Sequence, residues 1–224
     1  NLSEDALEAS SEAVRRIVAQ GHELASHGFA HGRASEQRPE EFRADVRRAK
    51  RLLEDTAGVA VQGYRAPSFS IGRTNLWALE CLAEEGYRYS SSIYPIRHDH
   101  YGMPEAPRFA HRPAVASALI EIPVTTVRVM NKTLPAGGGG YFRLLPYPLS
   151  KWTLQRVNRR DGQPCVFYFH PWEIDREQPR QRGIGMKTRF RHYVNLSRMQ
   201  GRIRRLLADF HWDRMDRIFL EGSA

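Results

Sequence analysis

Two histidines stand four residues apart at positions 27 and 31, in the stretch Ser-His-Gly-Phe-Ala-His that covers residues 26–31. If this stretch forms a helical turn, residues i and i+4 share a face and lie about 5–6 Å apart. Neutral imidazole is the commonest protein ligand of transition metals, and two imidazoles at that spacing suit a tetrahedral zinc site. His27 and His31 are therefore predicted to bind a divalent metal, with zinc as the expected ion; the alternative is a chance pairing.

Two further polar clusters carry groups that could take part in chemistry. Arg65 opens the stretch Arg-Ala-Pro-Ser-Phe-Ser, and His170 opens the stretch His-Pro-Trp-Glu. Each cluster follows a short apolar run, as the histidine pair does. The carboxyl ends of strands in a barrel or an open α/β sheet are where loops build active sites. The shared position of the three clusters favours a metal-assisted enzyme.

The elements that must position these clusters alternate between helices and strands. Helices are expected at residues 3–20, 39–57, 74–85 and 148–160, and a long basic helix or helix pair at residues 187–210. Strands are expected at residues 23–26, 59–64, 87–93, 119–130 and 166–169. The alternation predicts a largely parallel sheet covered by helices. Four consecutive glycines at 137–140 lack the G-K-[ST] sequence of a phosphate loop, so a tight turn or a close backbone approach to a ligand is expected there.

Composition is that of a globular α/β protein. The chain has 224 residues, of which 41% are hydrophobic and 26% charged, and it is long enough to bury the core of one larger domain. No apolar run approaches the ~20 residues of a membrane span, and no basic-then-apolar signal segment is visible. Cys81 and Cys165 stand far apart in apolar stretches and are expected to be reduced, which favours a cytoplasmic location.

The net charge of +9 is concentrated near the C-terminus, where residues 176–217 contain 12 Lys or Arg against 4 Asp or Glu. Such a segment can bind nucleic acid or another polyanion, but a solvated helix face has the same composition. No zinc finger, RNA-binding aromatic signature or glycine-loop clamp accompanies it, so nucleic acid is not expected as a partner.

The motifs together resemble a known family. Residues 26–31 are similar to the histidine motif of the polysaccharide deacetylases (NodB homology domain, carbohydrate esterase family four), residues 65–67 to their arginine–proline motif, and residues 168–170 to their late leucine-x-histidine motif. The stretches at 63–70, 91–95, 139–147 and 170–175 resemble the subfamily found with exosortase and exopolysaccharide clusters in Gram-negative bacteria. The similarity runs from about residue 14 to residue 219.

The resemblance implies a distorted (β/α) barrel of the glycoside hydrolase and deacetylase type, which removes acetyl groups from N-acetylated sugars of a polysaccharide. It implies that His27 and His31 bind the metal, that His170 is the general acid, and that Arg65 holds the catalytic carboxylate. The implied substrate contacts are Pro67, Ser68, Phe69, Tyr141 and Trp172.

The sequence departs from the family pattern in several places. The family carries an aspartate pair on its first strand, and the residues before Val14 do not resemble that strand. Ser68 stands where the family often has Tyr, and Ser90 where an acidic residue is expected. We therefore expect residues 1–175 to form a barrel without its first strand or strands, and residues 176–224 to form a basic helical extension packed on it.

Three functions are consistent with this sequence. The first is a metal-dependent polysaccharide N-deacetylase, and the second is a carbohydrate-binding domain that keeps the groove without catalysis. The third is a polyanion-binding or nucleic-acid-binding protein that uses the basic C-terminal third. Metal content together with acetate release separates the first function from the other two.

Overall fold

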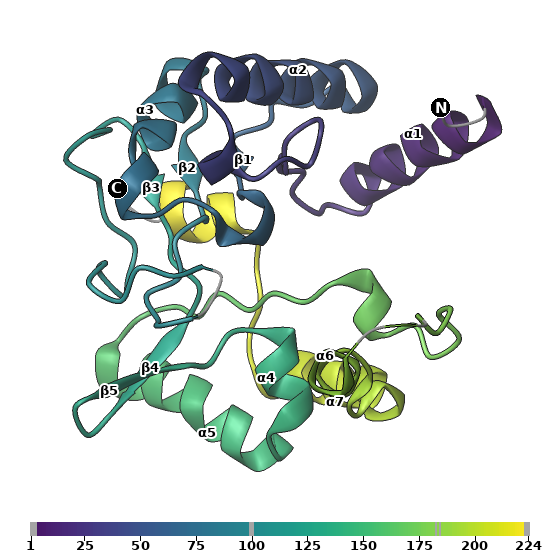
Figure 1. Cartoon of the computed structure of the whole chain (residues 1–224), viewed down its shortest axis with the longest axis vertical. Helices are drawn as coiled ribbons and strands as arrows, with labels where there is room; N and C mark the ends of the chain where they lie inside the picture. Colours follow the sequence, from purple (N-terminus) through teal and green to yellow (C-terminus); the bar gives the residue numbers. More distant parts are fainter. Residues whose placement is uncertain (1–3, 99–100, 182, 184, 222–224) are drawn as a thin grey trace. The chain divides into compact units, whose positions relative to one another are not determined.

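The computed structural model describes residues 4–98, 101–181, 183 and 185–221, which form two compact units (Figure 1). Unit 1 runs to Pro123 and takes in the C-terminal segment from Asp213 onward, and unit 2 runs from Val124 to Trp212. Within the described ranges, no helix combines the length and the apolar character needed to cross a membrane. The predicted domain boundary at residue 175 stays a prediction.

The helices of unit 1 begin and end close to the predicted positions. They are α1 (Glu4–Ala19), α2 (Pro39–Ala57) and α3 (Trp77–Glu84). Helix α2 starts at a proline, which fits the first helical turn because that turn needs no N–H donor. The backbone N–H of Arg38 donates to the Glu41 carboxylate at 3.0 Å and caps this end. Gly58 ends the helix with φ of 68°, a left-handed conformation that glycine adopts without strain.

The sheet of unit 1 is parallel, as predicted, but its strands are short. The order is β1 (Gly63–Tyr64), β2 (Tyr89–Ser90) and β3 (Ile120–Glu121). Ser26 extends the sheet through a parallel bridge to Tyr64, so the predicted strand at 23–26 contributes one paired residue. The buried core of the unit includes Phe42, Val46, Val61, Tyr64, Ile71, Leu79, Leu82, Tyr87, Ile93 and Leu119.

The strand predicted at residues 119–130 is wrong as a single element. Ile120 and Glu121 pair in the parallel sheet of unit 1, whereas Thr126–Val129 forms β4 of unit 2. Strand β4 pairs antiparallel with β5 (Lys132–Pro135), a strand that the sequence analysis did not predict. A β-branched run reads as one strand, and the proline at position 123, which lacks an N–H for a ladder, interrupts it.

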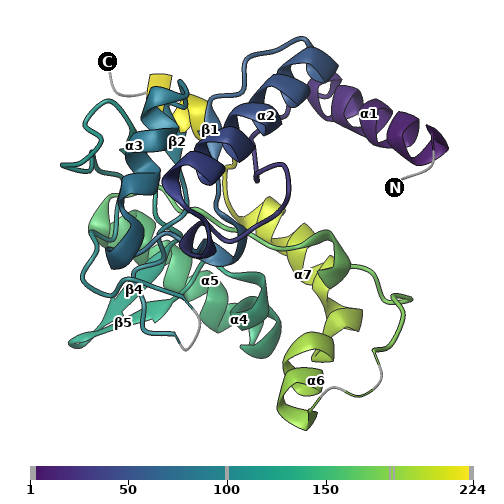
Figure 2. The same ribbon diagram turned by 45° about the horizontal axis from the view of Figure 1, so that its top comes forward.

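The remaining helices of unit 2 are α4 (Gly139–Leu144), α5 (Tyr147–Arg156), α6 (Met186–Tyr193) and α7 (Leu196–Asp209). The segment predicted as a basic helix or helix pair is a pair, and Figure 2 shows the break between α6 and α7. Asn195 occupies the left-handed region at this break, with φ of 53°. The buried core of the unit includes Val127, Phe142, Leu154, Val157, Met199 and Leu206.

Candidate functional site

The histidine pair lies in a bend of unit 1, directly after the bridged residue Ser26. This segment is not the helical turn that the spacing suggested. Gly28 and His31 instead take left-handed conformations, with φ of 82° and 55°. The bend still brings the two imidazoles together, with ring centroids 5.0 Å apart and ring planes at 71°. Both side chains are exposed, so the rings face solvent rather than the core.

Asp45 on helix α2 holds this bend. Its two carboxylate oxygens accept the backbone N–H groups of Phe29 at 2.9 Å and Ala30 at 2.8 Å. A Cβ on residue 28 would lie 2.8 Å from the same carboxylate and would be strained at φ of 82°, so glycine is required between the two histidines. The sequence analysis missed Asp45, because nothing in a helical stretch marks one carboxylate as the anchor of a distant loop.

The ring of His27 is held in one tautomer. Its Nδ1 lies 2.6 Å from the carbonyl oxygen of Arg65. A carbonyl oxygen only accepts hydrogen bonds, so Nδ1 of the neutral ring carries the proton and the lone pair is on Nε2. Metal-binding histidines commonly make this kind of second contact, which fixes the ring and leaves one nitrogen suited to the ion. His27 and His31 therefore fit two corners of a tetrahedral zinc site.

Two histidines are fewer protein ligands than the three of most catalytic zinc sites. Among the residues that the structure describes, no three His, Cys, Asp or Glu side chains come close enough to hold one metal ion. Within the described parts of the chain, His27 and His31 are therefore two candidate ligands without a third beside them.

Arg65 follows β1 and binds the neighbouring strand end. Its Nε donates to the carbonyl oxygen of Ser91 at 2.9 Å, and its Nη2 donates to the Ser91 hydroxyl at 2.7 Å. Its own N–H donates to the carbonyl oxygen of Ser26, which ties it to the histidine segment. The side chain is half-buried, and its guanidinium lies 5.7 Å from the centre of the Phe69 ring.

The predicted substrate contacts of unit 1 differ in exposure. Pro67, Ser68 and Phe69 form a short 3-10 turn after Arg65, in which Ser68 and Phe69 have φ of 57° and 51°. Pro67 and Phe69 are buried, and the Phe69 ring packs against Tyr94 with centroids 5.6 Å apart. Ser68 is exposed. Of the three, Ser68 is the residue that presents its side chain to solvent.

A buried carboxylate supports the segment that binds Arg65. Glu121 on β3 is fully buried, and its Oε1 accepts the backbone N–H groups of Ser92 at 2.9 Å and Ile93 at 2.8 Å. Its other carboxylate oxygen is buried and has no hydrogen-bond partner among the residues that the structure describes. Burial raises the pKa of Glu121, and the hydrogen bonds from Ser90, Ile93 and Ser92 oppose that rise only in part. Position 90, where an acidic residue was expected, is a serine, and the carboxyl group nearby belongs to Glu121 on the neighbouring strand β3.

The other predicted site residues lie in unit 2. His170 is exposed and follows Tyr168, which forms a parallel bridge with Gly138. Trp172 is half-buried and stacks on His170, with ring centroids 5.7 Å apart and ring planes at 23°. Tyr141 lies on α4 and is half-buried. His170 and Trp172 are therefore brought together, and the expectation that they share a cavity with the histidine pair stays a prediction.

Glu173 is a second buried carboxylate, and it lies beneath His170. Its side chain is 2% exposed and accepts Arg143 Nε on Oε1 at 2.9 Å and the His170 N–H on Oε2 at 2.8 Å. Burial acts to raise the pKa of Glu173, but the hydrogen bonds from the side chain and backbone of His170 and the charge of Arg143 outweigh it and lower the pKa. Glu173 is therefore an ionised structural group.

Two glycines of the run, Gly137 and Gly139, approach other parts of the protein closely. A Cβ on Gly137 would lie 2.2 Å from the carbonyl oxygen of Val166, and one on Gly139 would lie 2.2 Å from Glu173 Oε2. The sequence analysis recognised that such a run permits close contact. It did not identify the partner, because Val166 and Glu173 are about thirty residues away in the chain.

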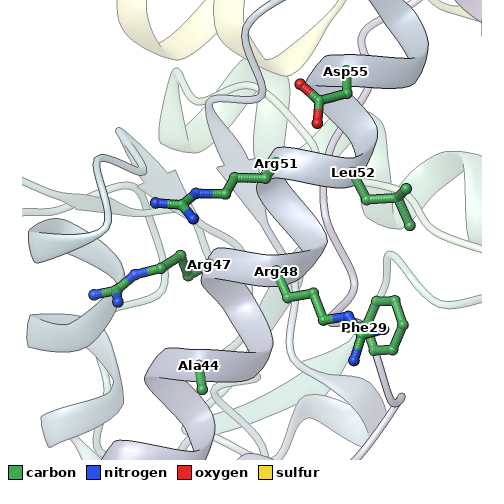
Figure 3. A pocket seen from close by; sticks show the side chains of 7 residues that line it. All are labelled: Phe29, Ala44, Arg47, Arg48, Arg51, Leu52 and Asp55. Carbon is green, nitrogen blue, oxygen red and sulfur yellow. The ribbon is translucent and has the colours of Figure 1, made fainter.

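A shallow basic hollow lies on the exposed face of α2 (Figure 3). Its lining residues are Phe29, Ala44, Arg47, Arg48, Arg51, Leu52 and Asp55. Figure 3 shows Arg48 reaching toward Phe29, and the guanidinium carbon lies 3.7 Å from the centre of that ring. Neither His27 nor His31 lines this hollow, although Phe29 of the same bend does.

Two family models match successive parts of the chain. A family model for polysaccharide deacetylases matches residues 2–90, and the model described as Domain of unknown function (DUF3473) matches residues 91–220. A peptidoglycan deacetylase of Helicobacter pylori is 30% identical over 88 residues, which cover 39% of this chain and 29% of that protein. The chain thus spans less than a third of this curated relative.

Solved structures agree on the fold. A protein of Mycobacterium smegmatis assigned to the polysaccharide deacetylases superimposes with a TM-score of 0.57 at 18% identity, covering 98% of this chain and 70% of that one. The PuuE allantoinase superimposes with a TM-score of 0.51 at 15% identity, covering 93% of this chain and 60% of that one. The predicted α/β class, of the (β/α)-barrel type, is confirmed by these neighbours. Because the DUF3473 model matches more than half of its residues, the chain belongs to the DUF3473 family, and its residues 2–90 are similar to polysaccharide deacetylases.

Proposed function

We propose that this protein is a metal-dependent hydrolase that removes N-acetyl groups from a polysaccharide, in a bacterial exopolysaccharide system. The observation that carries the proposal is the His27–His31 pair, whose imidazoles lie 5.0 Å apart while the Arg65 carbonyl fixes the His27 tautomer. The polysaccharide deacetylase match over residues 2–90 covers both histidines and Arg65. A zinc-like ion is the proposed cofactor.

Each predicted site residue has a part in this reaction. A divalent metal held by His27 and His31 would polarise the amide carbonyl and acidify a bound water. His170 would donate a proton to the sugar nitrogen as the carbon–nitrogen bond breaks, so that acetate and a free amine are the products. Arg65 would orient a carboxylate through its guanidinium. The sugar chain would contact Ser68, Tyr141 and Trp172, whereas the buried Pro67 and Phe69 would hold the turn that presents Ser68.

Metal content and acetate release test this proposal. The double variant His27→Ala/His31→Ala is expected to lose bound zinc and acetate release together. His22→Ala is the matched control, because His22 is an exposed histidine on the same segment and lies outside the pair. Equal zinc in the wild type and the double variant would show that the pair is not a metal site.

A second candidate is a carbohydrate-binding domain without catalysis. It is supported by the lack of a three-ligand cluster within the described parts of the chain. On this account the protein binds an N-acetylated oligosaccharide in calorimetry while releasing no acetate with added zinc. Acetate release that depends on His27 and His31 would exclude this second function.

A further inference from the structure

We propose that the C-terminal helices of unit 2 position the loop that carries His170 and Trp172, with Arg143, Glu173 and His192 as the positioning residues. This inference rests on the proposed function for the meaning of His170 as the general acid. It assigns a role to helices α6 and α7, which the deacetylase reaction above does not use.

Arg143 is the centre of this arrangement. It is 2% exposed and donates Nε to Glu173 at 2.9 Å. Its Nη1 donates to the carbonyl oxygens of His192 at 2.8 Å and Val194 at 3.0 Å, and its Nη2 donates to that of Arg191 at 3.2 Å. These carbonyls lie at the C-terminal end of α6, where unpaired acceptors and the helix dipole favour a cation. One guanidinium thus links the end of α6 to the carboxylate below His170.

Glu173 connects Arg143 to His170. Its Oε2 accepts the His170 backbone N–H at 2.8 Å and lies 3.7 Å from Nδ1 of the same residue. Because Glu173 is 2% exposed and bound on both oxygens, it cannot shift without breaking a buried ion pair. The position of the His170 backbone therefore depends on where Arg143 holds the carboxylate.

His192, whose carbonyl oxygen binds Arg143, makes a second link through aromatic stacking of its ring. Its ring lies on Trp172 with centroids 4.2 Å apart and planes at 9°, on a residue that also stacks with His170. Its Nε2 lies 2.9 Å from the Gln178 amide oxygen, and the amide nitrogen of Gln178 donates to the Trp172 carbonyl at 2.7 Å. Helix α6 thus fixes both the ring and the backbone of Trp172.

Helix α7 also binds the backbone of α4. Nη1 of Arg202 contacts the carbonyl oxygens of Phe142, Arg143 and Leu145 at 2.8, 2.8 and 3.1 Å. Asn195, at the break between α6 and α7, donates to the Arg143 carbonyl at 2.8 Å. The backbone of Arg143 is therefore held by the same helix pair whose carbonyls its side chain binds.

The test compares variants at Glu173 and His192 with a neighbouring control. In Glu173→Gln the side chain keeps its shape and loses the charge that Arg143 binds, and in His192→Ala the stack on Trp172 is removed. Glu177→Gln is the control, because Glu177 is exposed in the same loop and its backbone N–H bonds to Asp175. Ring resonances of His170 and Trp172 are followed by NMR in the full chain with selectively labelled histidine and tryptophan.

The proposal predicts that the ring resonances of His170 move in Glu173→Gln, that those of Trp172 move in His192→Ala, and that both stay unchanged in Glu177→Gln. With turnover present, misplacement of His170 in Glu173→Gln lowers kcat by about 10- to 100-fold while KM changes less than about twofold. If circular dichroism shows that Glu173→Gln does not fold, the ring resonances of Trp172 in His192→Ala test the inference instead.

If the ring resonances of His170 and Trp172 are the same in both test variants as in the control Glu177→Gln, the inference is overturned. If the resonances move while the wild-type protein releases no acetate, the positioning inference stands and the deacetylase proposal fails. The spectroscopic readout thus separates the two failures.

Discussion

Replacing Gly139 by alanine is expected to destabilise the protein, whereas the same change at Gly140 is not. The new Cβ at residue 139 would lie 2.2 Å from Glu173 Oε2 and 2.8 Å from its Cδ. Glu173 cannot retreat without losing Arg143, and breaking a buried ion pair costs about 3–5 kcal/mol. Alanine in place of glycine in a helix returns up to about 1 kcal/mol.

The net loss for Gly139→Ala is therefore roughly 2–4 kcal/mol. At roughly 2–4 °C per kcal/mol for a chain of this size, the melting temperature falls by about 4–16 °C. Gly140 is the adjacent residue of the same helix, and nothing lies within 4 Å of a Cβ built there. Gly140→Ala is accordingly expected to leave the melting temperature unchanged or raise it.

The assay is thermal and urea unfolding of the wild type and the two alanine variants, followed by circular dichroism. The difference between two neighbouring positions removes effects common to any glycine-to-alanine change. A Gly139→Ala protein that melts at or above the wild-type temperature would refute the placement of Glu173 against Gly139.

Other predictions concern the carboxylates of Asp45 and Glu121. Asp45→Asn replaces one carboxylate oxygen that accepts a backbone N–H of the bend with an amide donor, so the zinc affinity measured by calorimetry is expected to fall by about tenfold or more. Asp55→Asn, at an exposed position of the same helix, is the control and is expected to leave the zinc affinity unaltered. Equal losses of affinity in the two variants would contradict the role of Asp45. The raised pKa of Glu121 means that its contribution to stability is present at low pH and is lost as pH rises from the ordinary carboxyl range. Glu121→Gln, which cannot ionise, should therefore gain stability relative to wild type in urea unfolding as the pH rises above the ordinary carboxyl pKa of 4.5. A stability difference that does not change with pH would disprove this.

Local sequence signals were enough to predict most of the helices, but not α4 (Gly139–Leu144), whose glycines favoured a turn. Pro39 and Gly58 bound α2 in the structure as they do in the sequence, because a proline start and a left-handed glycine end are local properties of the chain. Strand lengths were less predictable. The apolar runs at 59–64 and 87–93 each give a two-residue strand, because pairing depends on a neighbouring strand that the run itself does not encode.

The chemistry of the histidine pair was visible in the sequence, but its geometry was not. Spacing alone suggested a helical turn, whereas the structure reaches the 5.0 Å approach through a bend held by Asp45. The bend forms because Gly28 accepts a left-handed backbone and a carboxylate sixteen residues from Phe29 accepts its N–H. Only folding brings Asp45 to that place.

The sequence by itself determined helix α2, the helical character of the basic C-terminal segment, the parallel pairing of the first strands, and the residue types that suit a metal-assisted hydrolase. Tertiary structure alone decided that the glycine run accommodates Glu173, and that Arg143 binds both this carboxylate and the end of α6. The physical reason is distance along the chain. Helix periodicity and capping act over a few residues, whereas a buried guanidinium must find acceptors 30 and 49 residues away to offset its desolvation.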